Sequence, residues 1–172
     1  NPDEFLKHPF KYAGLAPAAL ESFPKKTKLG ASVLKYETTI SSLPQLKCWP
    51  DDGGAFITLP LVYTEDIEHP GVLHSNLGMY RIQLSGNDYI TDKEIGLHYQ
   101  LHRGIGIHQS KANKKNQPMK VSIFVGGPPS LTLGAVMPLP EGISELTFAG
   151  VLGNRRIRYH YHNGFAIAND AD

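Results

Sequence analysis

Short apolar segments, separated by glycine, proline and aspartate, make up most of the chain from residue 32 onward. They are rich in β-branched and aromatic residues, and this composition between turn residues is typical of β-strands. Turns are predicted at DDGG, residues 51–54, and at SGND, residues 85–88. The segments predicted as strands are SVLKYETTI, LKCWP, AFITLPLVYTE, GMYRIQLSG, MKVSIFVGG and, near the end of the chain, GFAIA.

A strict alternation of side-chain type occurs in the segment RIRYHYH. Successive side chains of a strand point to opposite faces, so this pattern predicts a strand with two different faces. One face is expected to carry Arg156, Arg158, His160 and His162, and the other Ile157, Tyr159 and Tyr161.

Helical patterns are fewer. We expect helices from Arg103 to Asn113, in PPSLTLGAV and in EGISELTFAGVLG, where a proline pair or a helical apolar stripe supports them, and a short one from Ala16 to Ser22. Many short strands with a few helices predict an α+β fold with a mainly antiparallel sheet or a small barrel. Residues 1–30 are expected to be a lead-in segment, and residues 31–172 one domain.

Composition narrows the class of protein. A chain of 172 residues with 41% hydrophobic residues and a net charge of +1 fits one soluble domain without a global pull toward nucleic acid or membrane. It has one cysteine, Cys48, and no apolar run long enough to cross a membrane, so we expect a cytoplasmic protein. The absence of an initiator Met and the end just after a predicted strand suggest an excised part of a longer protein.

Three polar residues, Asn76, His102 and Glu145, lie within apolar stretches punctuated by glycine. Burying such groups costs several kcal/mol unless they find partners. An amide oxygen, an imidazole nitrogen and a carboxylate together suit a divalent cation such as Mn²⁺ or Mg²⁺. The alternatives are a turn cap for Asn76, an ordinary hydrogen-bonded histidine, and a first-turn helix carboxylate for Glu145.

Two arginines lie near these residues in the sequence. Arg81 either points to solvent by simple alternation or faces a pocket and binds a carboxylate through its forked guanidinium. Arg103 precedes Gly104-Ile-Gly106, which lacks the third glycine of a dinucleotide fingerprint. His98 and His102 are four residues apart, but the glutamate that a zinc protease requires is absent between them.

The remaining conspicuous residues have simpler interpretations. Asp51 and Asp52 are expected to be turn residues, and Cys48 and Trp49 core residues. The basic clusters include Arg155, Arg156 and Arg158 interleaved with tyrosines that offer stacking surfaces, which leaves an RNA-binding β domain as an alternative function.

Five segments, taken in order, resemble the central domain of the UbiD family of decarboxylases. They are CWPDDGGAFITLPLV, HSNLGMYRIQLSGNDY, GLHYQLHRGIG, VSIFVGGPP and GAVMPLPEGISELTFAG. The resemblance spans roughly Leu46 to Tyr161. The order N-L-G-M-Y-R, L-H-R-G and P-E-G-x-S-E makes it specific, whereas each motif alone is a weak signal.

The resemblance implies a flavin-reductase-like split β-barrel that binds prenylated FMN, with Mn²⁺ and often K⁺ between the protein and the cofactor phosphate. The metal ligands it implies are Asn76, His102 and Glu145. The cofactor contacts it implies are Met79, Tyr80, Arg81, His98, Tyr99, Gln100, Arg103 and Gly104. Arg81 is also the implied catalytic residue, which orients the substrate carboxylate.

The implied activity is reversible non-oxidative decarboxylation of aromatic or α,β-unsaturated carboxylic acids, such as a quinone-pathway hydroxyarenoate. The implied partners are that small-molecule acid, a flavin prenyltransferase that supplies the cofactor, and further copies of the full-length protein. The family's catalytic carboxylates lie downstream of YHYHNG, so we expect this chain alone to be inactive and assign no acid role to Asp170, Asp172 or Glu141. A non-catalytic domain that binds ordinary FMN is the main alternative.

Overall fold

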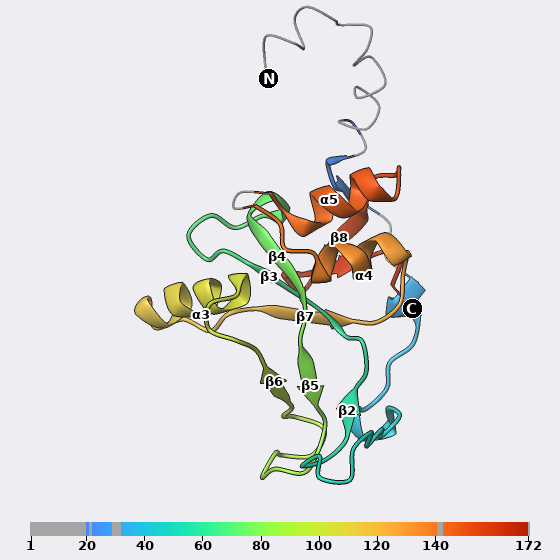
Figure 1. The fold of residues 1–172 in the computed structure, drawn as a ribbon, viewed down its shortest axis with the longest axis vertical. Coiled ribbons are helices and arrows are strands. Elements are labelled where there is room, and N and C mark those ends of the chain that lie inside the picture. Colours follow the sequence, from blue (N-terminus) through green and yellow to red (C-terminus); the bar gives the residue numbers. More distant parts are fainter. Residues whose placement is uncertain (1–19, 21, 29–31, 141–142, 172) are drawn as a thin grey trace, which may run out of the picture.

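The central sheet consists of three antiparallel strands in the order β4-β3-β7 (Figure 1). These strands are β3 (Leu61–Glu65), β4 (Ser75–Met79) and β7 (Val121–Phe124). The computed structural model describes residues 20, 22–28, 32–140 and 143–171. Because β4 is an edge strand of this sheet, one side of its backbone is open to contacts from side chains.

Two smaller sheets flank the central one. The first has the order β2-β5-β6 and is antiparallel, with β2 (Phe56–Ile57), β5 (Arg81–Gln83) and β6 (Gly96–His98). The second has the order β1-β8-β9. In it, β8 (Arg158–His162) pairs antiparallel with β9 (Phe165–Ala168) and parallel with the two-residue strand β1 (Lys25–Lys26).

The helices lie on opposite faces of the central sheet (Figure 1). Helix α3 (Gly104–Lys114) packs against β3 and β4, whereas α4 (Pro129–Val136) and α5 (Glu145–Leu152) pack on each other and on β4. The 3₁₀ helices are η2 (Ser32–Lys35), η3 (Ile40–Ser42) and η4 (Val72–His74). No helix in the described part of the chain combines the length and apolarity needed to span a membrane.

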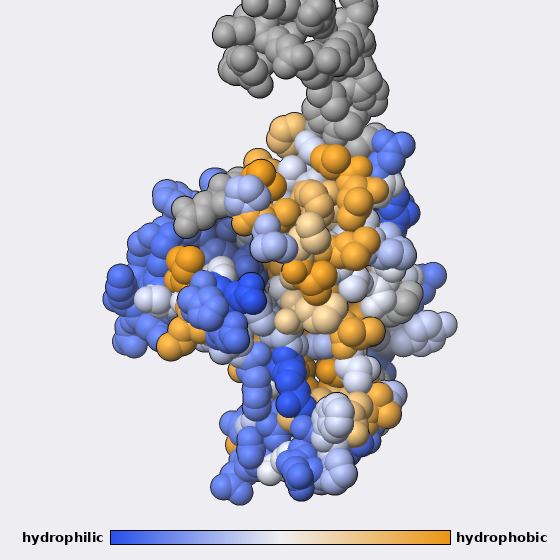
Figure 2. Space-filling model, viewed as in Figure 1, coloured by the Kyte–Doolittle hydropathy of each residue, from blue (hydrophilic) through white to orange (hydrophobic). Residues whose placement is uncertain are grey.

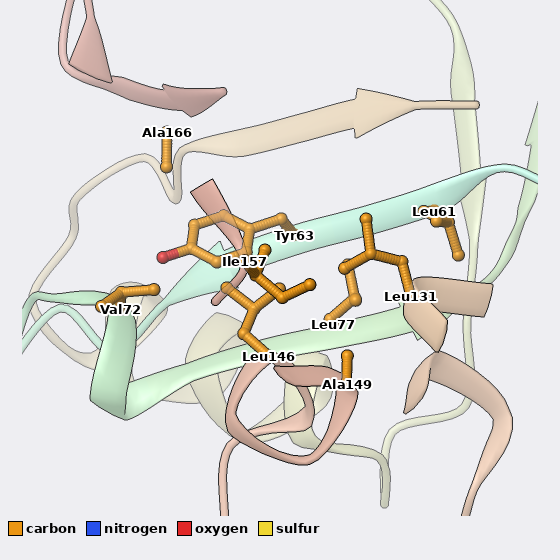
Figure 3. Packing of buried hydrophobic residues seen from close by; sticks show 9 residues of the cluster. All are labelled: Leu61, Tyr63, Val72, Leu77, Leu131, Leu146, Ala149, Ile157 and Ala166. Carbon is orange, nitrogen blue, oxygen red and sulfur yellow. The ribbon is translucent and has the colours of Figure 1, made fainter. Parts of the chain in front are cut away.

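Strand β3 is buried on both faces and therefore separates two cores. Leu61 and Tyr63 point into a cluster that includes Leu131 of α4 and Leu146 of α5 (Figure 3). Val62 points the other way, into a cluster with residues of the β2-β5-β6 sheet and of α3. Alternation along one strand thus joins the helix pair on one side to α3 on the other.

The outer faces of α4 and α5 carry exposed apolar side chains, which form a continuous apolar area in the space-filling view (Figure 2). They include Leu133, Val136, Met137, Val151 and Leu152.

The predicted α+β class is confirmed, and the three predicted helices in the described region form with bounds at most four residues from those expected. None of the sheets formed by the described residues closes into a barrel. The predicted helix from Ala16 to Ser22 lies mostly outside the described residues.

Some predictions were wrong. The segment SVLKYETTI forms η2 and the start of η3 instead of a strand, and LKCWP contributes a single bridge from Leu46 to Phe56. Trp49 is 70% exposed and Cys48 is exposed, so neither belongs to the core. His160 is buried, unlike Arg156, Arg158 and His162 of the same predicted face, and Asn169 Oδ1 accepts a 3.0 Å hydrogen bond from its Nδ1.

Candidate functional site

A pocket of about 350 Å³ lies where β4, β5 and β6 meet the start of α3 and the end of α4. Its walls come from four separate parts of the sequence. The lining residues are Met79, Tyr80, Arg81, His98, Tyr99, Gln100, Arg103, Ala135 and Val136. Seven of the eight residues predicted to contact a cofactor therefore line one pocket, and the eighth, Gly104, follows Arg103 directly at the first position of α3.

Strand pairing explains this convergence. Tyr80 separates β4 from β5, so the chain passes from the central sheet to the second sheet at this point. The antiparallel register of β5 and β6 sets Arg81 opposite His98, which brings the segment of residues 98–100 to the pocket. A turn at residues 101–102 then leads to Arg103, which precedes α3. The apolar end of α4 completes the wall.

Asn76 lies on the face of β4 that α3 covers. It is opposite Thr64 in the register of β3 and β4 and is only 7% exposed. Its Nδ2 donates a 3.3 Å hydrogen bond to the Tyr80 hydroxyl. The backbone of Gly104 approaches so closely that a Cβ at that position would lie 2.1 Å from Asn76 Oδ1. The start of α3 thus lies directly against the Asn76 amide oxygen.

Glu145 reaches the same strand from the opposite helix layer. It is the first residue of α5, as the first-turn interpretation expected. Its Oε2 accepts a 3.1 Å hydrogen bond from the backbone N–H of Leu77, a donor of the edge strand β4. Burial raises the pKa of the Glu145 carboxyl. Among the described residues, none of the ion pairs includes Glu145, so this carboxylate has capacity for a cation.

Tyr80 connects the pocket to these two residues. Burial raises the pKa of its hydroxyl; the Asn76 hydrogen bond and the positive charge of Arg103 act in the opposite direction, and the negative charge of Glu145 adds to the increase. The Asn76 amide thus lies at the Tyr80 hydroxyl, and the charges of Arg103 and Glu145 also act on this hydroxyl. Because Tyr80 and Arg103 line the pocket, this end of it is polar.

His102 is the predicted metal ligand that the structure does not join to the others. It is exposed in the turn before α3, and no hydrogen bond of the described residues connects it to Asn76 or Glu145. Within the described ranges there is also no group of three or more His, Cys, Asp or Glu side chains placed to share a metal ion. The pair that the structure brings to β4 consists of Asn76 and Glu145.

Arg81 is held by a residue that the sequence suggested only as a turn residue. Its Nη2 donates a 2.8 Å hydrogen bond to Asp52 Oδ1, and its guanidinium carbon lies 3.8 Å from the centre of the Phe56 ring. The hydrogen bond and charge of Arg81 outweigh desolvation and lower the pKa of Asp52. The pairing of β2 with β5 creates this contact. In the sequence, the only sign of it is that the predicted turn at residues 51–54 directly precedes a predicted strand.

A larger pocket, of about 580 Å³, lies elsewhere, between the end of β3 and the β8-β9 hairpin. It contains Glu65, whose carboxylate accepts hydrogen bonds from the hydroxyls of Tyr63 and Tyr161 and from the Gly71 N–H. These donors satisfy the carboxylate within the fold. No predicted site residue lines this pocket, so we assign the candidate site to the smaller one.

The basic segment behind the RNA-binding alternative is largely paired within the protein. Arg155 and Arg158 both form ion pairs with Asp170, and Arg156 Nε donates to the Phe23 carbonyl oxygen. These contacts neutralise part of the charge that a phosphate backbone would need.

Comparison with known proteins gives one family model, which matches residues 24–172 and is described as the UbiD 3-octaprenyl-4-hydroxybenzoate carboxy-lyase Rift-related domain. The chain is 42% identical over 150 residues to a 4-hydroxybenzoate decarboxylase subunit of Chlamydia pneumoniae, and the match covers 87% of this chain and 23% of that protein. It is 36% identical over 155 residues to an uncharacterised protein of Helicobacter pylori strain 26695, with 87% and 24% covered. The chain thus spans about a quarter of the length of these relatives.

Solved structures share the fold. The vanillic acid decarboxylase of Sedimentibacter hydroxybenzoicus in its closed form has a TM-score of 0.70 and 19% identity, over 91% of this chain and 35% of that one. The UbiD-class enzyme HmfF of Pelotomaculum thermopropionicum, in an evolved dimeric form in complex with prFMN, has a TM-score of 0.59 and 17% identity, over 69% and 26%.

Proposed function

This chain belongs to the UbiD family, and we propose that it forms the cofactor-binding part of a longer carboxy-lyase. The proposed reaction is the reversible, non-oxidative removal of CO₂ from an aromatic or α,β-unsaturated carboxylic acid. The observation that carries the proposal is the single pocket lined by residues 79–81, 98–100 and 103, with Asn76 and Glu145 next to its polar end.

The proposed cofactor is prenylated FMN, and the residues present fit its phosphate. Arg103 offers a forked donor, and the backbone N–H groups at the start of α3 add the partial positive charge of a helix N-terminus. The Gly104 backbone approaches Asn76 so closely that no side chain fits between them, which places the first residue of α3 against the Asn76 amide oxygen. When bound, the prenylated flavin would supply an electron sink that the protein side chains lack.

The proposed metal is Mn²⁺, with Asn76 and Glu145 as ligands. The Glu145 carboxylate is a cation ligand without a cationic partner among the described residues, and the Asn76 amide oxygen is a suitable second donor. We include His102 as the third ligand because it directly precedes Arg103; a rotation of the turn at residues 101–102 would be required to bring it in. A bound K⁺ is part of the same proposal.

Arg81 is the proposed catalytic residue. It lines the pocket with 56% of its side chain exposed, so nitrogen atoms not used by Asp52 are accessible to a ligand. A guanidinium binds a carboxylate through two parallel hydrogen bonds, which would orient the substrate for loss of CO₂. It would also stabilise negative charge that develops as the C–C bond breaks. The proton donor is proposed to lie in the remainder of the longer protein.

The wider proposals follow from the family. We propose that a flavin prenyltransferase supplies the cofactor, that the longer protein is a cytoplasmic homo-oligomer, and that residues 31–172 adopt the split-barrel topology when the rest of the protein is present. The present chain alone is proposed to be inactive.

The test is decarboxylation by the full-length protein after co-expression with a flavin prenyltransferase. We use 4-hydroxybenzoate first, since the chlamydial relative is named for it. Arg81→Ala is expected to lower kcat/KM, expressed per bound flavin, by about 10²-fold or more, because a charge-stabilising donor is lost. Arg156→Ala, a matched change away from the pocket, should retain activity.

The proposed role of Arg81 is contradicted by an Arg81→Ala protein that keeps full activity. A wild-type protein that binds unmodified FMN stoichiometrically, without any dependence on Mn²⁺, would instead favour a non-catalytic flavin-binding domain.

A further inference from the structure

Asp52 forms an ion pair with the proposed catalytic arginine, and contacts with the Trp49 backbone hold it in place. Its N–H donates to the Trp49 carbonyl oxygen over 3.1 Å, and its Oδ2 accepts from the Trp49 N–H over 3.3 Å. These two contacts close a turn around the carboxylate. The Asp52 side chain is 10% exposed, in contrast to the 56% exposure of Arg81.

The turn that carries Asp52 is itself packed against a second turn. A Cβ at Gly54 would lie 1.9 Å from the Ser85 carbonyl oxygen, so the two backbones touch where no side chain fits. The Ala55 N–H also donates to Ser85 Oγ over 3.1 Å. Since Ser85 follows β5, which begins at Arg81, both partners of the ion pair belong to one rigid unit.

The contact between Asp52 and Arg81 uses one edge of the guanidinium. Only Nη2 is within hydrogen-bond distance of Asp52, and only Oδ1 accepts it. The Phe56 ring packs against the guanidinium at 3.8 Å and fixes its plane, and the His98 ring meets Phe56 edge-on at 6.0 Å. Two independent contacts thus determine where Arg81 points, while its other nitrogens remain available at the pocket.

We infer that Asp52 is a positioning residue, which holds the Arg81 guanidinium at the pocket so that its free edge meets the substrate carboxylate. This inference rests on the proposed function. A free arginine side chain samples many rotamers, and a residue that fixes the guanidinium favours the productive geometry in advance. The Asp52 charge also repels an incoming carboxylate. In the affinity for the substrate, this repulsion offsets the benefit of a guanidinium that is already oriented. The main effect is therefore expected on kcat rather than on KM.

The first measurement tests the contact without reference to turnover. The full-length protein is treated with phenylglyoxal, and modification of each arginine is followed by peptide mass spectrometry. Asp52→Asn and Asp52→Ala should raise the rate at Arg81 about threefold or more, because a neighbouring carboxylate stabilises the unreactive protonated guanidinium. The rate at Arg158, which pairs with Asp170, is the internal reference.

The second measurement is a double-mutant cycle on the holoenzyme. Asp52→Ala should lower kcat about tenfold while KM changes less than about threefold, because small misplacements of an orienting group reduce the rate. Asp52→Glu should restore part of kcat. In an Arg81→Lys background, Asp52→Ala should no longer lower kcat. If Asp52 acts only through Arg81, its removal has no further effect once the guanidinium is gone. Asp51→Asn, in the same turn but exposed, is the matched control.

The outcomes separate the two proposals. Unchanged Arg81 modification, unchanged kcat in Asp52→Ala, or an effect of the same size in both backgrounds contradicts the positioning role alone. A cofactor-loaded wild-type protein without turnover contradicts the proposed function, and the positioning role of Asp52 with it.

Discussion

The positions of individual residues in the candidate site depend on close contacts between backbone and side chains. Asn76 is buried against the first residue of α3, and only a glycine at position 104 allows its amide oxygen to lie this close to the helix. The sequence suggested Asn76 and Glu145 as ligands because both interrupt apolar stretches. It could not indicate that the Asn76 amide donates to the Tyr80 hydroxyl, since that contact depends on the course of the chain between β4 and β5.

Gly104→Ala tests this close approach. The new Cβ would lie 2.1 Å from Asn76 Oδ1, so the amide or the start of α3 must move. We expect a loss of stability of about 1–3 kcal/mol in urea unfolding, typical of overpacking, and weaker Mn²⁺ binding by the full-length protein. Gly53→Ala is the matched control, because its Cβ would make an ordinary 3.5 Å contact. Equal stability and Mn²⁺ affinity of the Gly104→Ala and wild-type proteins would refute this explanation.

Among the secondary-structure elements, helix α3 is held against the central sheet by polar contacts. Thr64 Oγ1 and His108 Nδ1 form a buried 2.9 Å hydrogen bond, and Lys111 Nζ donates to Asp66 Oδ2 over 2.5 Å. Desolvation opposes ionisation of Asp66, but the Lys111 hydrogen bond and the Glu68 N–H together lower the pKa of Asp66 from 3.8 to about 2. This network orients the helix whose first turn borders the proposed phosphate site.

Asp66→Asn is expected to destabilise the protein by about 1 kcal/mol at pH 7, a value reduced for the solvent around the partly exposed Lys111. Because the pKa of Asp66 is lower in the folded than in the unfolded protein, its ion pair stabilises the fold above about pH 4. That contribution is lost as the pH falls from 3.8 through about 2. Urea unfolding should therefore show a difference between variant and wild type at pH 7 that shrinks below about pH 4 and is lost below about pH 2. A difference independent of pH would exclude the ion pair as its source.

The success of the sequence predictions also varied with the type of element. The helices were predicted correctly because their signals are local, such as the proline pair before α4 and the lysines at the end of α3. The segment SVLKYETTI has strand-like composition, but no cross-strand partner among the described residues, and it forms 3₁₀ turns with Tyr36 87% exposed. Strand formation depends on pairing with distant residues, which composition does not reveal.

The pocket forms only when distant segments of the chain come together in the folded molecule. Its lining residues come from two sheets, from helix α4 and from the segment that leads into α3. The sequence motifs identified these residues only through the resemblance to a family. Physical reasoning from the sequence gave the residue types that suit a cation and an anion. Strand register then determined that Arg81 and His98 are opposite each other and that Asp52 reaches Arg81.

The central claim is that this pocket holds a prenylated flavin together with a divalent metal ion. Its most direct test is mass spectrometry of the small molecules and metal released from the full-length protein after co-expression with a flavin prenyltransferase. We predict prenylated FMN and Mn²⁺ in comparable amounts, both lost in an Asn76→Ala, Glu145→Ala double variant that remains folded. Release of unmodified FMN alone, or of no flavin from a folded wild-type protein, would contradict the claim.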